Sequence, residues 1–373
     1  MKLPSISDIT LLSGVRVLVR LDLNVPFEGD VIRDTFRIDQ AIPTIRLLRE
    51  GGARVLIISH HSDEKQTLRP VAEYLAGSFS VRWGGDVCNP DAALREDDEI
   101  VLCENLRQCA GEEENDETFA RHLASLADVY INDAFGVAHR THASIVGVPT
   151  FLHTYFGPLF CTEIKHLSHA FSPEHPALLI LGGAKISTKL PLVEAMLGTF
   201  DHIFIGGALM NNLFKAKGYE IGHSLYDEAA PDVTELLSNP RIMIPEDVVV
   251  RNGSGVVEKA ASAVAPDEMI RDCGPRAIAA LGGVISRAKF ILVNGPLGDY
   301  EERGFEKGTV AAIRHIQKSD AYAIIGGGDS VALLDEAGLE GAFDFVSTGG
   351  GAMLAFLIHK TLPAIDAVVG IKK

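Results

Sequence analysis

Short apolar runs alternate with segments of helical periodicity along most of this 373-residue chain. Runs such as Ala177–Leu181 and Phe290–Asn294 are typical of strands buried on both faces, because almost every residue in them is apolar. This alternation favours an α/β fold built on parallel, doubly wound sheets. The predicted strands are Val15–Val19, Val55–Ser59, Ile100–Cys103, Val129–Asn132, Ala177–Leu181, His202–Ile205, Arg241–Ile244, Phe290–Asn294, Ala321–Ile325 and Phe343–Val346, with Val81–Trp83 as a weaker candidate.

The alternation is interrupted once, between about Pro158 and Phe171, by a longer amphipathic helix. Ser172–Pro176 follows, and its two prolines cannot continue a helix. Strand-like runs then start again, so we expect two α/β domains joined by a helix. Other helices are predicted at Ala41–Arg49, with Pro43 in or just after the first turn, at Thr118–Ala127 and at Leu190–Leu197.

The composition excludes some classes of partner. A formal net charge of −16 argues against nucleic acid, because neutralising phosphates needs a basic surface, but it leaves small anionic ligands open. The N-terminus lacks the apolar core of a signal peptide and no run approaches 18 apolar residues, so we expect a soluble, cytoplasmic protein without a membrane partner. Five scattered cysteines without a C-x-x-C pair indicate reduced thiols, each expected to be buried.

Different residues follow the predicted strands of the two halves. Polar side chains follow those of the first half, as at His60 and Asn132-Asp133. Glycine turns follow those of the second half, as at Gly182-Gly183 and Gly206-Gly207. Ligands of open α/β sheets bind outside the carboxyl ends of the strands. We therefore expect one half to bind a small charged substrate and the other a nucleotide.

Three arginines of the first half, Arg37, Arg107 and Arg140, each follow a predicted strand or precede a helix. Guanidinium groups match carboxylate and phosphate oxygens bidentately, so three of them in one cleft would bind a small multiply charged acid. Asp22 and Asn24 alternate after the first strand and would point to the same face. Taken singly, each arginine is explained more simply as a surface ion pair.

The stretch Leu181–Lys189 combines a strand end, a glycine turn and a predicted helix start. Free amide N–H groups at such a junction favour anions, and Lys185 and Lys189, four residues apart, would share one helix face. This stretch alone is equally consistent with a phosphate cradle and with an ordinary turn that carries two solvated lysines. Two further glycine turns, Gly326–Ser330 and Ser347–Ala352, favour the phosphate hypothesis, and the Asp-Ser pair of the first suits Mg²⁺.

Seven motifs follow one another along nearly the whole chain. They are Arg20–Pro26, Glu104–Arg107 with Gly111–Glu113, Asn132–Gly136 with Ala138–Arg140, Leu181–Lys185, Asn294–Pro296, Gly326–Ser330 and Ser347–Ala352. Together they resemble the motifs of the phosphoglycerate kinase family, in that family's order. Coincidence is not a serious explanation for seven collinear motifs.

The resemblance implies two Rossmann-like, doubly wound parallel-sheet domains joined by a hinge helix. Residues 1–165 would bind phosphoglycerate and residues 166–357 the nucleotide, with a tail of about residues 358–373 packed back on the first domain. It also implies a monomeric enzyme that transfers a phosphoryl group reversibly between 1,3-bisphosphoglycerate and Mg-ADP, giving 3-phosphoglycerate and ATP. Domain closure would bring the two substrates together away from water.

The resemblance also assigns roles by matching position. The phosphoglycerate would bind to Asp22, Asn24, Arg37, His60, Arg107 and Arg140. The nucleotide would bind to Lys189, Gly206, Gly207, Pro296, Glu301, Gly328, Asp329 and Ser330, and Mg²⁺ to Asp329. Arg37, Lys185 and Gly350 would lie nearest the transferred phosphoryl group. No general base is needed, because the acceptor carboxylate is ionised at neutral pH, so positioning and positive charge must perform the catalysis.

Two positions depart from the family pattern. Asp63 stands where the family has an arginine that helps to hold the substrate phosphate, and losing one charge-assisted hydrogen bond costs about 1.5–3 kcal/mol, or roughly 10- to 150-fold in affinity. Lys65 is a possible substitute cation. Asp299 stands where a valine usually faces the adenosine, which would weaken or alter nucleotide binding. We expect a weakened enzyme rather than an inactive one.

Three other hypotheses have less support. Asp63 and Asp299 motivate a phosphoglycerate-kinase-like paralogue that only binds a ligand or a protein, although the retained phosphate-binding lysines argue against it. A dinucleotide-dependent oxidoreductase would need G-x-G-x-x-G in the first βα turn, and Leu21–Asp30 contains no such pattern. A metal site at His139 and His142 lacks a third ligand with suitable spacing.

Overall fold

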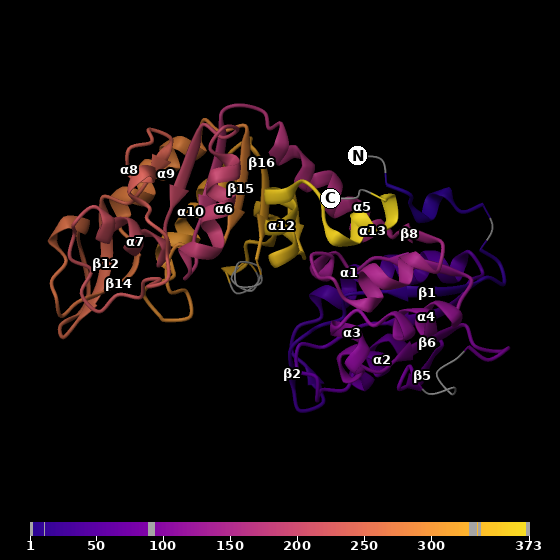
Figure 1. Ribbon diagram of the computed structural model, residues 1–373. Coiled ribbons are helices and arrows are strands. Elements are labelled where there is room, and N and C mark those ends of the chain that lie inside the picture. Colours follow the sequence, from indigo (N-terminus) through magenta and orange to yellow (C-terminus); the bar gives the residue numbers. More distant parts are fainter. Residues whose placement is uncertain (1–2, 11, 89–93, 328–333, 335–336, 371–373) are drawn as a thin grey trace. The chain divides into compact units, whose positions relative to one another are not determined.

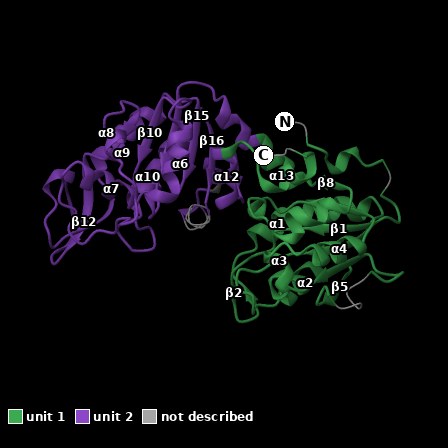
Figure 2. Ribbon diagram, viewed as in Figure 1, with its two compact units in different colours: residues 1–165, 359–373 green, residues 166–358 purple. Residues whose placement is uncertain are grey.

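The computed structural model describes residues 3–10, 12–88, 94–327, 334 and 337–370. The chain divides into two compact units, called unit 1 (residues 1–165 and 359–373) and unit 2 (residues 166–358) and coloured separately in Figure 2. Each unit is built on a six-stranded parallel sheet, which confirms the predicted α/β fold class. The first boundary lies within helix α5 (Pro158–Leu167), where the sequence predicted the longer helix.

In unit 1 the parallel strands have the order β5-β6-β4-β1-β7-β8. Val17 and Val19 belong to one hydrophobic core and Leu18 to another, because successive residues of a strand point to opposite faces of the sheet. Both faces are therefore covered, which explains the apolar runs. The strands are β1 (Arg16–Arg20), β4 (Arg54–Ile58), β5 (Val81–Gly85), β6 (Ile100–Cys103), β7 (Val129–Asn132) and β8 (Thr154–Phe156), with a small hairpin of β2 (Phe27–Glu28) and β3 (Val31–Ile32). The helices before α5 are α1 (Phe36–Glu50), α2 (Arg69–Ala76), α3 (Ala110–Glu113) and α4 (Glu117–Ser125).

The C-terminal segment belongs to unit 1 as well (Figures 1 and 2). Helix α13 (Pro363–Val369) packs against the π-helix η5 (Ala143–Gly147). The Ala364 amide donates a hydrogen bond to the carbonyl oxygen of Ala138 at 3.2 Å, and Ile365 is fully buried. This segment thus covers the part of unit 1 that follows β7.

In unit 2 the parallel strands have the order β11-β10-β9-β15-β16-β17, and a separate antiparallel sheet has the order β13-β12-β14. The parallel strands are β9 (Ala177–Leu181), β10 (His202–Ile205), β11 (Ile242–Met243), β15 (Phe290–Asn294), β16 (Tyr322–Gly326) and β17 (Phe345–Ser347). The antiparallel strands are β12 (Asp247–Asn252), β13 (Gly255–Ala260) and β14 (Met269–Cys273). The helices are α6 (Ile186–Met196), α7 (Leu209–Ala216), α8 (Thr234–Leu237), α9 (Pro275–Ile285), α10 (Lys307–Gln317) and α12 (Gly351–His359).

The structure corrects three local predictions. Helix α1 begins at Phe36 rather than Ala41, so Pro43 lies in its interior, where burial of Ile45 and the neighbouring apolar residues outweighs one lost backbone hydrogen bond. No strand was predicted between Ile244 and Phe290, yet β12, β13 and β14 lie in this segment. The cysteines are not all buried, because Cys88 is exposed while Cys109 and Cys161 are half-buried.

Among the described residues, no single helix combines the length and apolar character needed to span a membrane. The consecutive helices α12 and α13 together have the length and apolar composition of a broken span, and the chain bends at the break between them.

Candidate active site

The first group of predicted site residues lies at the carboxyl edge of the sheet in unit 1. Asp22 follows β1 and is buried, and its Oδ2 accepts a hydrogen bond from Arg37 Nη1 at 2.8 Å. Arg37 lies in the first turn of α1, so this ion pair fixes the start of the helix against the strand end. The Asn24 side chain accepts a hydrogen bond from the Ser62 amide at 2.9 Å, which links the segment after β1 to the segment after β4.

His60 is almost completely buried in a cationic environment. Burial is the main cause that holds its pKa well below the usual value, and the positive charges of Arg20, Arg107, Arg37 and Arg140 lower it further. Arg20 Nη2 lies 3.2 Å from His60 Nδ1, and because a guanidinium can only donate, Nδ1 is the acceptor and Nε2 carries the proton. A neutral imidazole donor among four cations is well suited to an anionic ligand.

Arg20 is a site residue that the sequence did not single out. Its side chain is fully buried and donates to Ser144 Oγ at 3.0 Å and to the Leu21 carbonyl at 2.6 Å, besides His60. Ser144 in turn donates to the buried carboxyl of Glu112 at 2.6 Å. The only sequence signal was an arginine at the end of an apolar strand, where a charge without a partner would be costly.

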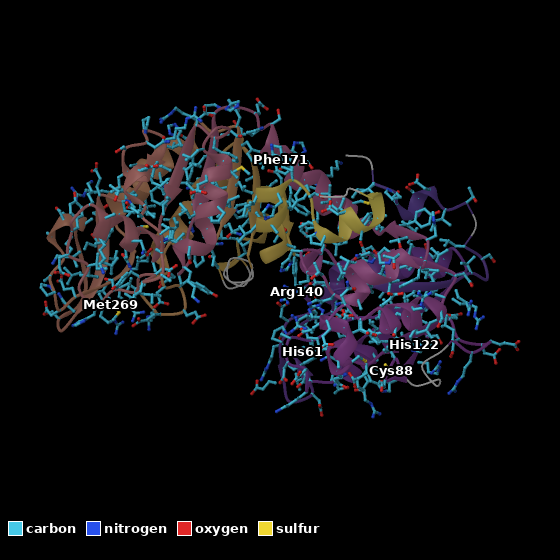
Figure 3. All side chains as sticks on the ribbon, in the orientation of Figure 1. His61, Cys88, His122, Arg140, Phe171 and Met269 are labelled. Atoms are coloured by element: carbon cyan, nitrogen blue, oxygen red, sulfur yellow. The ribbon has the colours of Figure 1, made fainter. Side chains whose placement is uncertain are left out.

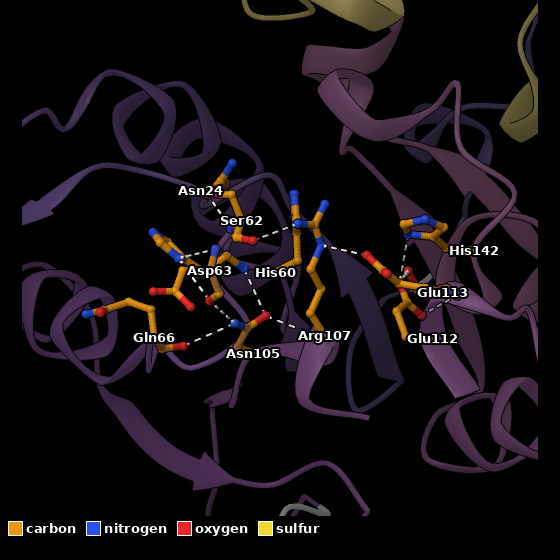
Figure 4. Close-up of polar contacts among 12 residues, drawn as sticks. Asn24, His60, Ser62, Asp63, Gln66, Asn105, Arg107, Glu112, Glu113 and His142 are labelled. Carbon is orange, nitrogen blue, oxygen red and sulfur yellow. Dashed lines mark hydrogen bonds and ion pairs between the residues drawn. The ribbon is translucent and has the colours of Figure 1, made fainter. Parts of the chain in front are cut away.

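Arg107 and Asn105 hold the segment Ser62–Gln66 from the other side, as Figure 4 shows. Arg107 Nη1 donates to the Ser62 carbonyl at 3.0 Å. Arg107 also forms an ion pair with Glu113, in which Nε lies 3.2 Å from Oε1 but makes no hydrogen bond. Asn105 donates to the carbonyl oxygens of Asp63 and Gln66, at 3.1 Å each. The polar residues after β4 and β6 are therefore joined into one network.

Asp63 does not provide the cation that the family pattern has at this position. It is exposed, and its Oδ1 accepts a hydrogen bond from the Lys65 amide at 2.9 Å. The carboxylate thus closes a local turn.

Arg140 is the one predicted arginine whose Nε is buried without any hydrogen-bond or ion-pair contact among the described residues. His139 Nδ1 next to it is likewise buried without a hydrogen-bond partner. Burial and the charge of Arg140 lower the pKa of His139. Buried donors without partners are rare in folded proteins, so Arg140 Nε indicates a place for an acceptor atom of a ligand.

In unit 2 the glycine turns after β9, β10 and β15 pack against one another. A Cβ added to Gly182 would overlap the carbonyl oxygen of Pro296, and one added to Gly207 would lie 2.7 Å from the Gly183 nitrogen. The amide of Gly183 donates to the Pro296 carbonyl at 3.0 Å. Glycine is required here because the backbones of neighbouring turns come too close for a side chain.

A pocket of about 300 Å³ adjoins these turns. It is lined by the predicted nucleotide residues Gly207, Pro296 and Glu301, and also by Arg271 and Asp299. Arg271 and Asp299 form an ion pair within the pocket, so the unusual aspartate is neutralised by a partner. Gly206 lies beside the pocket lining, against Leu297 and Cys273.

The two lysines of the glycine-turn stretch have different positions. Lys185 is the exposed N-cap of α6 in an extended conformation, so the prediction that it shares a helix face with Lys189 is wrong. Lys189 lies on α6 and donates to the Asn294 side chain. In the first turn of α6, the Ser187 amide donates a hydrogen bond to Asp227 at 3.1 Å. One of the N–H groups that could bind an anion therefore already has a partner.

The remaining predicted residues follow the strands β16 and β17. Gly350 has a φ of +43° immediately before α12, a conformation that favours glycine. Gly328, Asp329 and Ser330, including the predicted Mg²⁺ ligand, lie outside the described residues.

Comparison with known proteins decides the family. Residues 6–360 match the family model described as phosphoglycerate kinase. The chain belongs to the phosphoglycerate kinase family. It is 38% identical to the phosphoglycerate kinase of Maricaulis maris over 96% of each chain, and 40% identical to that of Moorella thermoacetica over 96% of this chain and 97% of the relative.

Solved structures agree. The phosphoglycerate kinase from Coxiella burnetii matches with a TM-score of 0.87 and 35% identity over 99% of each chain. The enzyme from Pyrococcus horikoshii matches with a TM-score of 0.85 and 29% identity over 98% of each chain. The predicted family, fold and kinase class are therefore confirmed, and a non-catalytic paralogue is not favoured.

Proposed function

We propose that this phosphoglycerate kinase catalyses reversible phosphoryl transfer between 1,3-bisphosphoglycerate and Mg-ADP, giving 3-phosphoglycerate and ATP. The main support is the cluster of arginines around His60, in which Arg140 Nε is buried without a partner among the described residues. Such a cluster is stabilised by a small ligand with several negative charges.

Unit 1 binds the phosphoglycerate in this proposal. Arg107 and Arg140 neutralise its acidic groups, His60 donates from Nε2, and Asp22 holds Arg37 in position. The acceptor carboxylate is ionised at neutral pH, so the protein supplies no general base and acts by positioning and positive charge. Arg37 faces the group that is transferred.

Unit 2 binds the nucleotide. The base and ribose occupy the pocket beside Gly207, Pro296 and Glu301, and Gly206 allows the backbone to approach closely. Lys189, Gly328 and Ser330 bind the phosphates, while Lys185 and the amide groups near Gly350 stabilise the charge on the transferred phosphoryl oxygens. Asp329 would hold Mg²⁺, which would supply positive charge to the nucleotide phosphates.

Transfer requires both substrates in one water-free site, so we infer that the units close about α5 during the cycle. We also propose a monomeric, cytoplasmic enzyme whose partners are its small-molecule substrates. A net charge of −16 supports the absence of nucleic acid among these partners.

The test is a coupled assay with 3-phosphoglycerate and Mg-ATP on folded protein, with Arg46→Ala as a control because Arg46 is exposed on α1. We expect turnover in the wild type and the control, and loss of turnover when Mg²⁺ is chelated. Absence of turnover in folded wild-type protein would contradict the proposal.

A further inference from the structure

Three metal-binding side chains outside the substrate site converge beside the carboxyl end of β5. The sulfur atoms of Cys88 and Cys109 lie 3.6 Å apart, and Cys109 Sγ lies 3.9 Å from Asp86 Oδ1. The three ligand atoms all lie within 4.8 Å of one another. Asp86 and Cys88 are exposed and Cys109 is half-buried, so an ion can reach the cluster from solvent.

The spacing of the two sulfur atoms matches metal coordination better than a disulfide. Zinc–sulfur bonds of about 2.3 Å in tetrahedral geometry place two thiolates about 3.8 Å apart, close to the spacing found here. A disulfide needs about 2.0 Å between the sulfur atoms, much shorter than the 3.6 Å found here.

Backbone contacts hold the three ligands in place. Asp86 Oδ1 accepts a hydrogen bond from the Cys88 amide at 2.9 Å, so the carboxylate turns toward its neighbour. His122 of α4 donates from Nε2 to the Val87 carbonyl at 3.0 Å, and Figure 3 shows His122 close to Cys88. Cys109 is fixed by its amide, which donates to the Leu106 carbonyl at 3.0 Å. The cluster therefore joins two constrained segments.

We propose that Asp86, Cys88 and Cys109 form a binding site for one thiophilic divalent metal ion of the Zn²⁺ type, with the fourth position taken by water. Binding releases the two thiol protons to solvent, since thiolates are the ligands. Two thiolates and one carboxylate select zinc-like ions over Mg²⁺, which prefers oxygen ligands. The site is thus chemically different from the proposed Mg²⁺ site of phosphoryl transfer and independent of it.

The position of Cys109 gives this site a structural consequence. Cys109 ends the 3₁₀ helix η3 (Leu106–Gln108), which contains Arg107, and precedes α3, which contains the Arg107 partner Glu113. β5 is the edge strand of the sheet and pairs only with β6 among the described strands. A bound ion would tie this edge to the segment that positions Arg107, and so stabilise unit 1.

Cobalt titration tests the proposal, because Co²⁺ replaces Zn²⁺ in tetrahedral thiolate sites and gives a thiolate-to-metal charge-transfer band. With the full chain, reduced and stripped of metal, we expect the band to saturate at one equivalent of Co²⁺ and to disappear when Zn²⁺ is added. The band should be lost in Cys88→Ser and in Cys109→Ser. It should persist in Cys161→Ser, whose thiol lies on α5 outside the cluster.

Thermal unfolding provides a second measurement. Zn²⁺ should raise the melting temperature of the wild type and of Cys161→Ser but not that of Cys88→Ser. In protein that has not been treated with a reductant, all five thiols should react with a thiol reagent after metal removal and denaturation. The proposal is overturned if the wild type gives no charge-transfer band, if Cys88→Ser gives an equal band, or if only three thiols react, since the pair would then be a disulfide.

Discussion

The candidate sites of the two units are built differently at the same kind of place, the carboxyl edge of a parallel sheet. In unit 1 charged side chains surround a buried histidine, and most of them are held by partners such as Asp22. In unit 2 glycine turns bring backbone atoms together, and the adjoining pocket contains the neutralised pair Arg271 and Asp299. Ligand binding at the first site should therefore be sensitive to loss of charge, and ligand binding at the second site to added volume.

Lys185→Ala tests a charge in unit 2 and should have the largest effect. Removing one group that stabilises the developing charge should lower kcat by about 100- to 1,000-fold. Lys185 is exposed, so the melting temperature should stay the same, as in the control Lys289→Ala on an exposed lysine of the same unit. Steady-state kinetics and thermal unfolding measure both quantities. A fall in kcat accompanied by a clear fall in melting temperature would mean that Lys185 acts only as the structural cap of α6.

Arg140→Ala tests a charge in unit 1. Loss of a charge-assisted contact to the substrate should raise KM for 3-phosphoglycerate by roughly 10- to 150-fold and leave KM for ATP unchanged. Its Nε has no partner among the described residues, so stability should not fall. Initial-rate kinetics and thermal unfolding, with Arg46→Ala as the matched control, would measure this. A fall in stability without a change in KM for the acid would refute the assignment.

Gly182→Ala tests volume in unit 2. The added methyl group would overlap the Pro296 carbonyl, and overpacking of this kind costs about 1–3 kcal/mol of unfolding free energy. ADP affinity should fall as the turn shifts, while 3-phosphoglycerate affinity should not. Gly198→Ala is the control, because its Cβ would have no neighbour within 4 Å. Denaturant unfolding and calorimetry measure the effects, and equal stability of the two variants would contradict the close packing.

The buried His60 predicts a pH dependence of stability. Its pKa is depressed in the folded chain, so the unfolded chain binds a proton at low pH that the folded chain does not. The free energy of unfolding should thus fall as the pH drops below about 6.5, by at most about 1.4 kcal/mol per pH unit from this residue. Denaturant unfolding at pH 7 and pH 5 should show a weaker fall for His60→Gln, which cannot titrate. The same fall in both proteins would show that His60 is not responsible.

Asp63→Arg should have the smallest effect. An arginine here would restore the cation of the family pattern and lower KM for 3-phosphoglycerate by about tenfold, at the low end of one charge-assisted hydrogen bond. Asp63→Asn, which removes the charge but adds no cation, should lower KM by less. Kinetics of the two variants separate these contributions. An unchanged KM in Asp63→Arg would mean that position 63 does not face the substrate.

Most of the fold could be predicted from the sequence because buried parallel strands leave a strong local signal. Ala177–Leu181 and Phe290–Asn294 were predicted with the bounds that the structure gives. β13 (Gly255–Ala260) was missed because this exposed antiparallel strand lacks a continuous apolar run, and β14 (Met269–Cys273) because Arg271 and Asp272 interrupt its apolar residues. The start of α1 was misplaced because Pro43 suggested a first turn, while tertiary burial stabilised the longer helix.

The site was less predictable, because it depends on contacts between residues far apart in the chain. Arg20 and Ser144 meet only in the folded unit, so no spacing in the sequence indicates the support of His60. The same holds for Cys88 and Cys109, which lack C-x-x-C spacing. Asp133 was grouped with the polar strand ends, yet it is fully buried and accepts a hydrogen bond from the Phe160 amide at 2.7 Å, a structural role.

The central claim is that unit 1 binds 3-phosphoglycerate and unit 2 binds Mg-ADP. Hydrogen exchange of the full chain with each substrate alone tests this claim most directly. Two physically different sites on two units predict that 3-phosphoglycerate protects amides of residues 59–63 and 104–113, and that Mg-ADP protects those of residues 182–189 and 295–301. When only one ligand is present at a time, the two sets of protected amides should not overlap. Protection of unit 2 by 3-phosphoglycerate alone, or of the His60 region by Mg-ADP alone, would contradict the account.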